Sequence, residues 1–233
     1  MKLVLVRHGR TAANVSGALD TGWPGLPLDA TGCKQAEALA QRWEKEVTSK
    51  PNLVLVSGLL RTRMTAAPLC ERYGMSPRIA WGLREIRAGS CEMGTSDVQN
   101  MYYHGTVHQW ISKNRELRMP EAETGWEVLG RALPEVYQGI SQVYQSVGDK
   151  GVLVLVIHGA LTRFLTSALS RDDMSALLTN CFMTNTGTTI FEVPHSVASS
   201  CADGTFHPHD LLESLPLLTW NDTPAPCVSD ICV

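Results

Sequence analysis

Three short, almost wholly apolar runs restrict most strongly the folds open to this chain. They lie at 3–6 (LVLV), 52–57 (NLVLVS) and 151–157 (GVLVLVI). Apolar runs without alternation are typical of strands buried on both faces, as in a parallel sheet. Helical patterns lie between the runs, and this alternation places helices on both faces of such a sheet. The sequence therefore predicts the α/β class, as a three-layer α/β/α sandwich with a mainly parallel central sheet.

The remaining elements follow from local patterns, of which the one within 96–124 is the weakest. Helices are expected from Thr31 as the N-cap to Val47, over 60–73, within 96–124, over 126–147 and directly after His158. Further strands are expected at 78–81, 187–193 and 216–220. We expect Pro134 to kink the long helix or to split it in two. No composition shift divides the chain, so a single domain over 1–233 is expected, with 221–233 as a C-terminal tail.

The composition argues against several classes of protein. The 233 residues carry a formal net charge of −3 and no Lys/Arg tract, so no nucleic-acid partner is expected. No apolar run approaches the roughly 18 residues of a membrane span, and the first run is far too short for a signal peptide. Seven cysteines are scattered without metal-binding spacing. We therefore expect no membrane partner, reduced thiols and a cytoplasmic protein.

Two of the apolar runs end in histidine followed by glycine, at 7–9 (RHG) and 158–159 (HG). The carboxyl ends of adjacent parallel strands meet at one edge of the sheet, where ligands of open α/β sheets bind. Arg61, just after the second run, reaches the same edge. The glycines let the backbone approach a ligand, and the amides that open the next helix favour an anion. Two histidines, two arginines and helix amides together predict a site for a doubly charged phosphoryl group.

The segment LVRHGRTAAN resembles the Arg-His-Gly-x-Thr-x-x-Asn signature of the histidine phosphatase superfamily, the phosphoglycerate-mutase-like enzymes. Four further segments are similar in the same order: LPLDATGCKQAEALA, VSGLLRTRMTAAPL, LREI and VLVLVIHGALTRFL. The resemblance covers 2–95 and 151–193 well and 96–150 loosely. The final segment, LTWNDTPAPCVSDICV, is similar to the end of actinobacterial members, particularly glucosyl-3-phosphoglycerate phosphatases.

The resemblance implies a role for each matching residue. His8 is the nucleophile that forms a phosphohistidine, while Glu85 protonates the leaving oxygen and then activates water. The residues implied or expected to hold the phosphoryl group are Arg7, Thr11, Asn14, Arg61, His158 and Gly159. No metal and no cofactor are expected, and the partner is a small phosphorylated metabolite.

The expected activity is metal-independent hydrolysis of a phosphomonoester, a sugar phosphate or a phosphoglycerate derivative. A phosphoglycerate-type mutase is the first alternative, although the Glu-Arg-His-Tyr-Gly segment of mutases is absent, since 86–89 after Glu85 reads IRAG. The second alternative is a binding module that keeps the fold without turnover. A homodimer, through an apolar sheet edge or the tail, is also open.

Three positions depart from the family pattern: Arg10 replaces a carboxylate or amide, Gly58 an aspartate and Cys91 a tryptophan. Arg10 either enlarges the positive mouth of the site or points to solvent. The candidates for the substrate side of the pocket are Trp23, Arg87, Tyr102, Tyr103, His104 and Arg163. Core or helix-face packing is the simpler expectation for the aromatic residues, and a surface position for Arg163.

Overall fold

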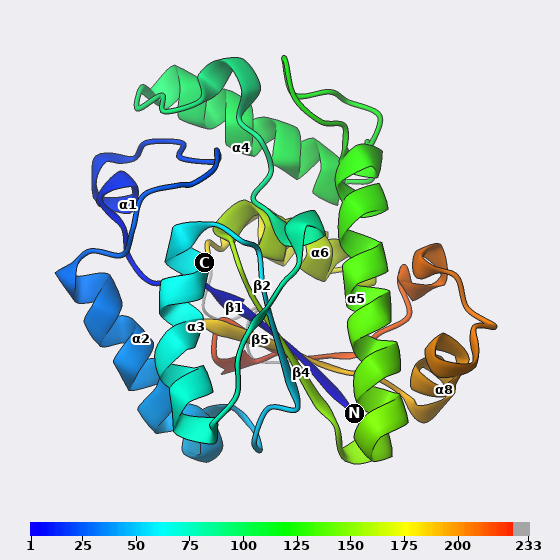
Figure 1. The fold of residues 1–233 in the computed structure, drawn as a ribbon. Helices are drawn as coiled ribbons and strands as arrows, with labels where there is room; N and C mark the ends of the chain where they lie inside the picture. Colours follow the sequence, from blue (N-terminus) through cyan, green and yellow to red (C-terminus); the bar gives the residue numbers. More distant parts are fainter. Residues whose placement is uncertain (226–233) are drawn as a thin grey trace.

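The strands of this computed structural model, which describes residues 1–225, form one seven-stranded sheet of order β3-β2-β4-β1-β5-β6-β7 (Figure 1). The strands are β1 (Lys2–Arg7), β2 (Leu53–Val56), β3 (Arg78–Ile79), β4 (Val152–Ile157), β5 (Thr188–Glu192), β6 (Leu217–Trp220) and β7 (Thr223–Pro224). Strands β1 to β4 pair in parallel, whereas β5, β6 and β7 pair antiparallel at one edge. The expected mainly parallel α/β sheet is confirmed. Positions 226–233 of the expected tail, with Cys227 and Cys232, lie outside the described residues.

Leucine and valine alternate along the three central strands, so different residue types cover the two faces of the sheet. Leu155 is in register with Leu5 and Leu55 and faces one core. Val156 is in register with two valines, Val6 and Val56, and faces the other core. Both faces are buried, which explains why these strands lack polar alternation.

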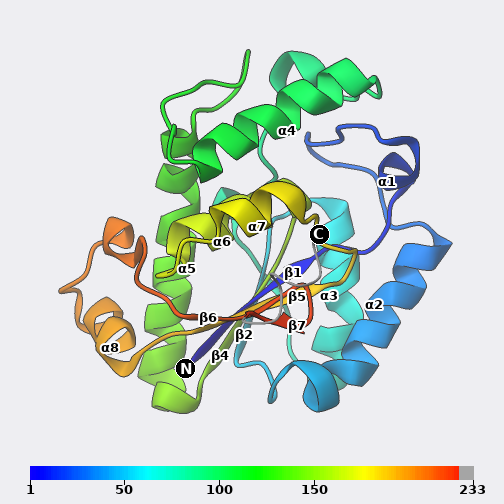
Figure 2. The same ribbon diagram turned by 180° about the vertical axis from the view of Figure 1, so that it is seen from behind.

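Helices cover both faces of the sheet (Figures 1 and 2). The valine face packs against α2 (Ala30–Arg42) and α3 (Leu60–Tyr73). The leucine face packs against α4 (Asp97–Ile111), α5 (Gly125–Val147), α6 (Gly159–Leu169) and α8 (His195–Asp203). Two short helices, α1 (Ala12–Ser16) and α7 (Ser175–Asn180), lie in the connections. The expected three-layer arrangement is therefore confirmed.

Two helix predictions need correction. Asp29, not Thr31, caps α2, since its carboxylate accepts a hydrogen bond from the Gly32 amide at 2.7 Å, and aspartate is a stronger N-cap than threonine. Helix α5 continues through Pro134 instead of splitting there. Its buried face packs closely on the sheet, and this packing outweighs the one backbone hydrogen bond that proline removes.

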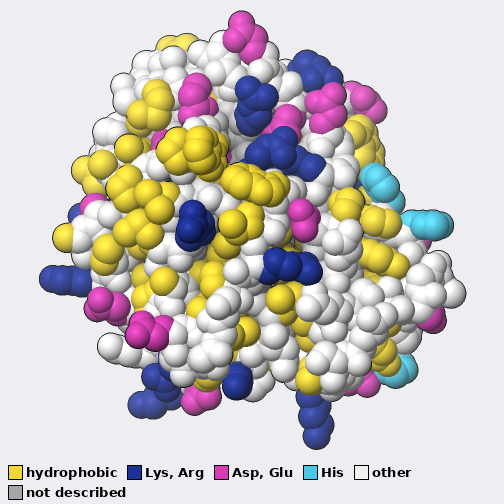
Figure 3. Space-filling model, viewed as in Figure 1, with side chains coloured by type: hydrophobic (Ala, Val, Ile, Leu, Met, Phe, Trp, Pro, Cys, Tyr) yellow, Lys and Arg dark blue, Asp and Glu magenta, His cyan; other side chains and the backbone are white. Residues whose placement is uncertain are grey.

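Helix α4 explains why the pattern within 96–124 is weak. The helix ends at Ile111, and only turns and bridge residues follow to 124. It buries Tyr103 and Trp110, but it also exposes Val98 and Met101. Figure 3 shows apolar side chains gathered at the upper left, in the region of α4 and α1 in Figure 1. With apolar side chains on both sides, the helix has no clear periodicity.

The cysteines depart in part from the expectation. Cys33, Cys70, Cys91 and Cys201 are free thiols. Cys181 is disulfide-bonded, so the expectation of reduced thiols is wrong at that position; the spacing of cysteines in a sequence does not reveal their pairing. Within residues 1–225, no helix combines the length and the apolar character that crossing a bilayer requires.

Candidate active site

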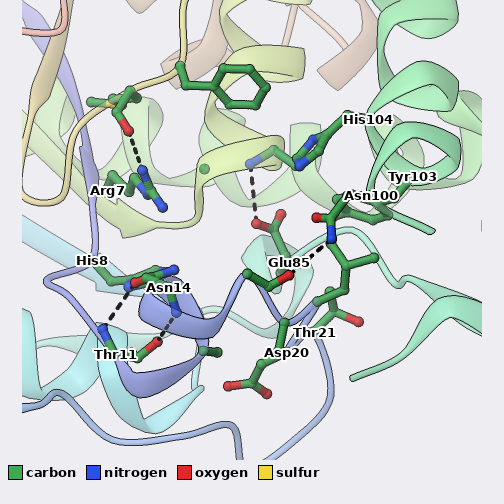
Figure 4. A pocket seen from close by; sticks show the side chains of 18 of the residues that line it. Arg7, His8, Thr11, Asn14, Asp20, Thr21, Glu85, Asn100, Tyr103 and His104 are labelled. Atoms are coloured by element: carbon green, nitrogen blue, oxygen red, sulfur yellow. Dashed lines mark hydrogen bonds between the residues drawn. The ribbon is translucent and has the colours of Figure 1, made fainter. Parts of the chain in front are cut away.

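The carboxyl ends of β1 and β4 bring the two predicted histidines together. Arg7 and Ile157 are paired in register at the ends of these strands, so His8 and His158 follow side by side. Their ring centroids lie 5.3 Å apart. A cavity opens at this edge (Figure 4). Its walls include these predicted site residues: Arg7, His8, Thr11, Asn14, Arg61, Glu85 and Gly159.

One nitrogen of the His8 imidazole is already used in a hydrogen bond. Its Nδ1 lies 2.7 Å from the carbonyl oxygen of Gly9, and because a carbonyl only accepts, Nδ1 carries the proton. The backbone is also fixed: the His8 amide donates to Ile157 at 3.0 Å, and the His8 carbonyl accepts from Asn185 Nδ2 at 3.0 Å. In the neutral ring, the lone pair that remains for attack is therefore on Nε2.

The surroundings of His8 favour this neutral form. Burial lowers the pKa of His8 well below its usual value, and the cations of Arg61 and Arg7 lower it further. Protonation would place a third positive charge beside two guanidinium groups. His8 therefore keeps its lone pair well into the acidic range.

His158 lies next to the cavity but is not among its lining residues, and it holds Arg61. Its Nδ1 accepts a hydrogen bond from Arg61 Nε at 3.2 Å, so its proton is on Nε2, which contacts Ser57 Oγ at 2.7 Å. Burial lowers the pKa of His158 well below the usual value, helped by the Arg61 cation. A neutral His158 thus orients the Arg61 guanidinium towards the cavity.

Arg7 supplies a cation that has no carboxylate partner among the described ion pairs. Its Nη1 donates to the Met183 carbonyl, while its buried Nε has no hydrogen-bond partner within residues 1–225. Gly159 makes room for this group, since a Cβ there would lie 3.2 Å from Arg7 Nε. An unsatisfied buried N–H in an anion-binding setting is a donor ready for a phosphoryl oxygen.

Asp20 is a carboxylate in the cavity wall that the sequence analysis did not identify. Arg61 Nη1 contacts Asp20 Oδ2 at 3.2 Å, and Arg61 Nη2 donates to the Asp20 carbonyl at 2.8 Å. The same Oδ2 accepts from the Leu26 amide at 2.8 Å. Asp20 lies in a turn-rich loop, where a single acidic residue carries no signal in the sequence. A phosphate dianion that binds Arg61 has to compete with this carboxylate.

Replacing Asp20 by asparagine should tighten the binding of phosphate. Asparagine keeps the shape and an acceptor for Leu26 but removes the charge that competes for Arg61. We expect the competitive inhibition constant of inorganic phosphate to fall about tenfold. Asp29→Asn is the matched control, because Asp29 pairs with Arg10 outside the cavity and asparagine still caps α2. An unchanged or higher inhibition constant in Asp20→Asn contradicts this competition.

Glu85 lies on the amides that open α6. Its Oε1 accepts from the amides of Ile86 at 2.9 Å and Leu161 at 3.0 Å, and its Oε2 accepts from the amide of Ala160 at 3.2 Å. The helix amides that were expected to favour an anion thus contact this carboxyl group. Burial raises the pKa of Glu85 and outweighs these bonds and the Arg61 cation, which oppose it.

An ion pair between the half-buried Arg131 and the buried Glu123 fixes the segment that carries Glu85. Arg131 Nη1 donates to the carbonyls of Gly82 at 2.6 Å and Arg84 at 2.8 Å, and its Nη2 donates to that of Glu85 at 3.2 Å. Glu123 accepts from Arg131 Nε at 2.6 Å. Arg131 lies on α5, so this helix positions the candidate acid from the leucine side of the sheet. The sequence offered no signal for this pair.

Thr11 and Asn14 form the cap of α1. The Thr11 hydroxyl accepts from the Asn14 amide at 3.3 Å, and Asn14 Oδ1 accepts from the Thr11 amide at 3.0 Å (Figure 4). Asn185 Nδ2 also reaches Asn14 Oδ1, at 3.2 Å. These bonds hold the turn after His8 rigid at the mouth of the cavity.

The other candidate residues are distributed unevenly. Tyr103, His104 and Arg163 line the cavity, and Arg163 is only 1% exposed, so the expected surface position is wrong. The cavity walls do not include Arg10, Trp23, Arg87 or Tyr102. Arg10 pairs with Asp29 at 2.8 Å.

The local structure explains why position 58 is glycine and not the aspartate of the family pattern. Gly58 adopts a φ of +87°, and a Cβ would lie 2.7 Å from the Trp81 ring, so glycine is required there. Cys91 is a buried free thiol. In the part of the chain described, no three His, Cys, Asp or Glu side chains are grouped so that they could hold a metal ion.

Comparisons with known proteins agree with this geometry. A model of the histidine phosphatase superfamily (branch 1) matches residues 3–199. Glucosyl-3-phosphoglycerate phosphatase of Mycolicibacterium vanbaalenii is 32% identical over 174 residues, which cover 72% of this chain and 73% of that protein. The 2,3-bisphosphoglycerate-dependent phosphoglycerate mutase 2 of Lactobacillus johnsonii is 33% identical over 188 residues, covering 70% and 80%. A shorter match, 41% identical over 87 residues, spans 37% of this chain and 15% of PE-PGRS family protein PE_PGRS11 of Mycobacterium tuberculosis.

A solved structure extends the likeness to the fold. Mycobacterial glucosyl-3-phosphoglycerate phosphatase in complex with inorganic phosphate superposes with a TM-score of 0.67 at 26% identity, covering 95% of this chain and 97% of that one. The resemblance seen in the sequence is confirmed, as is the expected class of enzyme, a phosphomonoesterase. The chain belongs to branch 1 of the histidine phosphatase superfamily.

Proposed function

We propose that this enzyme hydrolyses phosphomonoesters of small metabolites through a phosphohistidine at Nε2 of His8. The observation that carries the proposal is the hydrogen bond from His8 Nδ1 to the Gly9 carbonyl, which leaves Nε2 as the nucleophile in a cavity with Arg7, Arg61 and Glu85. In the first step Nε2 bonds to phosphorus and the ester P–O bond breaks. The leaving oxygen takes the proton of the Glu85 carboxyl group.

The second step reverses the role of Glu85. Its carboxylate takes a proton from a water molecule, whose oxygen attacks phosphorus as the P–N bond breaks. Phosphate leaves, His8 is again neutral and Glu85 is again protonated. In both transition states, charge on the transferring group is balanced by preorganised donors: Arg7, Arg61, and the turn of Thr11 and Asn14. Since these arginines supply the positive charge, we expect activity to survive chelation of metal ions.

Burial gives the two titrating groups the protonation states that this reaction needs. With ordinary pKa values, a neutral histidine would rarely occur in the same molecule as a protonated glutamate. The reason is that the pKa of histidine lies above that of glutamate. Here the pKa of His8 is lowered and that of Glu85 is raised. The separation favours a neutral nucleophile beside a protonated acid.

The substrate that we propose is a sugar phosphate or a phosphoglycerate derivative. Relatives named glucosyl-3-phosphoglycerate phosphatase match most of the chain, which makes that compound a first candidate. The relative named as a mutase keeps phosphoryl transfer between phosphoglycerates as the alternative. We further propose that 1–233 is a single domain. Cytoplasmic location and a homodimer stay predictions.

The test is a panel of phosphomonoesters assayed for phosphate release in the presence of EDTA. It should contain 3-phosphoglycerate, glucosyl-3-phosphoglycerate, common sugar phosphates and an aryl phosphate. We expect release that survives chelation. Isomerisation of phosphoglycerates without release would favour the mutase, and loss of activity in EDTA would contradict the mechanism.

A further inference from the structure

Three buried nitrogens in the cavity wall have no hydrogen-bond partner within the described residues: Arg7 Nε, His104 Nδ1 and Arg163 Nη1. Arg7 directly precedes His8 and belongs to the phosphoryl end. His104 projects from α4, and Figure 4 shows it on the far side of Glu85 from Thr11 and Asp20. The His104 nitrogen therefore needs another explanation than the reacting phosphoryl group, and Arg163 contacts the same aromatic ring as His104, that of Phe182.

The guanidinium of Arg163 is buried, and hydrogen bonds hold all but one of its nitrogens. Its Nε donates to the Leu178 carbonyl at 2.8 Å, and its Nη2 donates to that of Thr179 at 3.1 Å. It lies over the Phe182 ring, 4.3 Å from the centroid. Its Nη2 also lies 2.7 Å from His108 Nε2, so only Nη1 lacks a partner within residues 1–225, and none of the partners of Arg163 is a carboxylate. A buried cation without a counter-ion is costly, which favours an anionic ligand.

His104 contacts the same aromatic ring. Its imidazole makes T-shaped contacts with two rings, those of Phe182 and Tyr103. The centroid of each ring lies 5.1 Å from that of the imidazole. Burial, with help from the Arg163 cation, lowers the pKa of His104 to about 4, so the ring is neutral near pH 7. A neutral imidazole can still donate one N–H bond to an anion.

We propose that Arg163 Nη1 and His104 Nδ1 form a second anion subsite, which binds a carboxylate of the substrate at the end of the cavity away from His8. The inference rests on the proposed function and narrows it to phosphorylated carboxylic acids. Two single donors match the two oxygens of a planar carboxylate, and the one uncompensated charge matches a monoanion. A second phosphate dianion would require more donors and more charge than this end offers.

The test compares two substrates that differ at this carboxylate, 3-phosphoglycerate and glycerol 3-phosphate. The readout is the ratio of their kcat/KM values, because a loss common to both substrates cancels. We expect the wild-type ratio to favour 3-phosphoglycerate by at least about tenfold. Arg163→Met should lower it roughly ten- to a hundredfold. His104→Phe, which keeps the ring packing, should lower it about three- to tenfold.

Arg115→Met is the matched control, because Arg115 is also a buried arginine, stacked on Trp126 at 5.1 Å, but lies outside the cavity. Its ratio should equal that of the wild type. If Arg163→Met fails to fold, His104→Phe decides. A wild-type ratio near one, or a ratio unchanged in the folded variants, overturns the subsite. If the wild type hydrolyses none of the phosphomonoester panel, the proposed function itself fails, and the two failures are therefore distinguishable.

Discussion

Replacing His8 by alanine should abolish phosphate release from every substrate of the panel. Nε2 is the attacking atom, and the neighbouring His158 cannot take its place, because its two ring nitrogens are bonded to Arg61 and Ser57. Loss of a covalent nucleophile typically costs roughly 10⁴-fold or more in kcat. Steady-state phosphate release measures the effect.

The variant should keep its phosphate site, because Arg7 and Arg61 are untouched. Binding of inorganic phosphate to His8→Ala, measured by calorimetry, should be retained. His209→Ala is the control for loss of a histidine, since His209 is exposed and lies outside the cavity. Release from His8→Ala within a factor of ten of the wild type would rule out His8 as the nucleophile.

Replacing Glu85 by glutamine should separate substrates by their leaving groups. A general acid is worth roughly 10²- to 10⁴-fold, and alkyl phosphates need it because an alkoxide is a poor leaving group. Their kcat/KM should fall by that factor. An aryl phosphate expels a stable phenolate, so its kcat/KM should fall far less. Equal losses for both kinds of substrate would contradict the role of acid; Glu116→Gln, at an exposed site, is the control.

The pH dependence of kcat/KM should also report the role of Glu85 as the acid. The neutral form of His8 is lost only when the pH falls through a pKa that lies well below the usual 6.5. The acid form of Glu85 is lost as the pH rises through a pKa raised above 4.5. For alkyl phosphates, kcat/KM should therefore be highest in the acidic range and fall about tenfold per pH unit beyond the Glu85 pKa. The alkaline limb should be absent in Glu85→Gln; its persistence there would assign it to another group.

Much of the fold could be predicted because local patterns coincide with the final burial. The runs at 3–6, 52–57 and 151–157 are apolar since both faces of these strands are covered. The expected element over 60–73 matches α3. The expectation of a split at Pro134 was wrong because packing keeps α5 continuous there. The helix within 96–124 is confirmed as α4, but its bounds could not be predicted because its faces are not segregated.

From residue patterns alone, the candidate site could be predicted only as far as strand ends mark it; the family resemblance added Thr11, Asn14 and Glu85, which line the cavity. His8, Arg61 and His158 follow apolar runs, so parallel topology alone brings them to one edge. Asp20 and Arg131 act through contacts with distant residues, and such pairing leaves no trace in a single sequence. The burial of Arg163 likewise depends on how α6 packs against α4 and α7.

The most direct test of the central claim is to trap the phosphoenzyme. The enzyme would be mixed with a phosphomonoester that it hydrolyses, quenched in alkali within a single turnover, and the phosphoryl group located by mass spectrometry of its peptides. We predict one phosphohistidine, on the peptide that contains His8, and none in His8→Ala. Phosphate release with no phosphoryl group on His8, or with the group on another residue, would contradict the mechanism derived from this site.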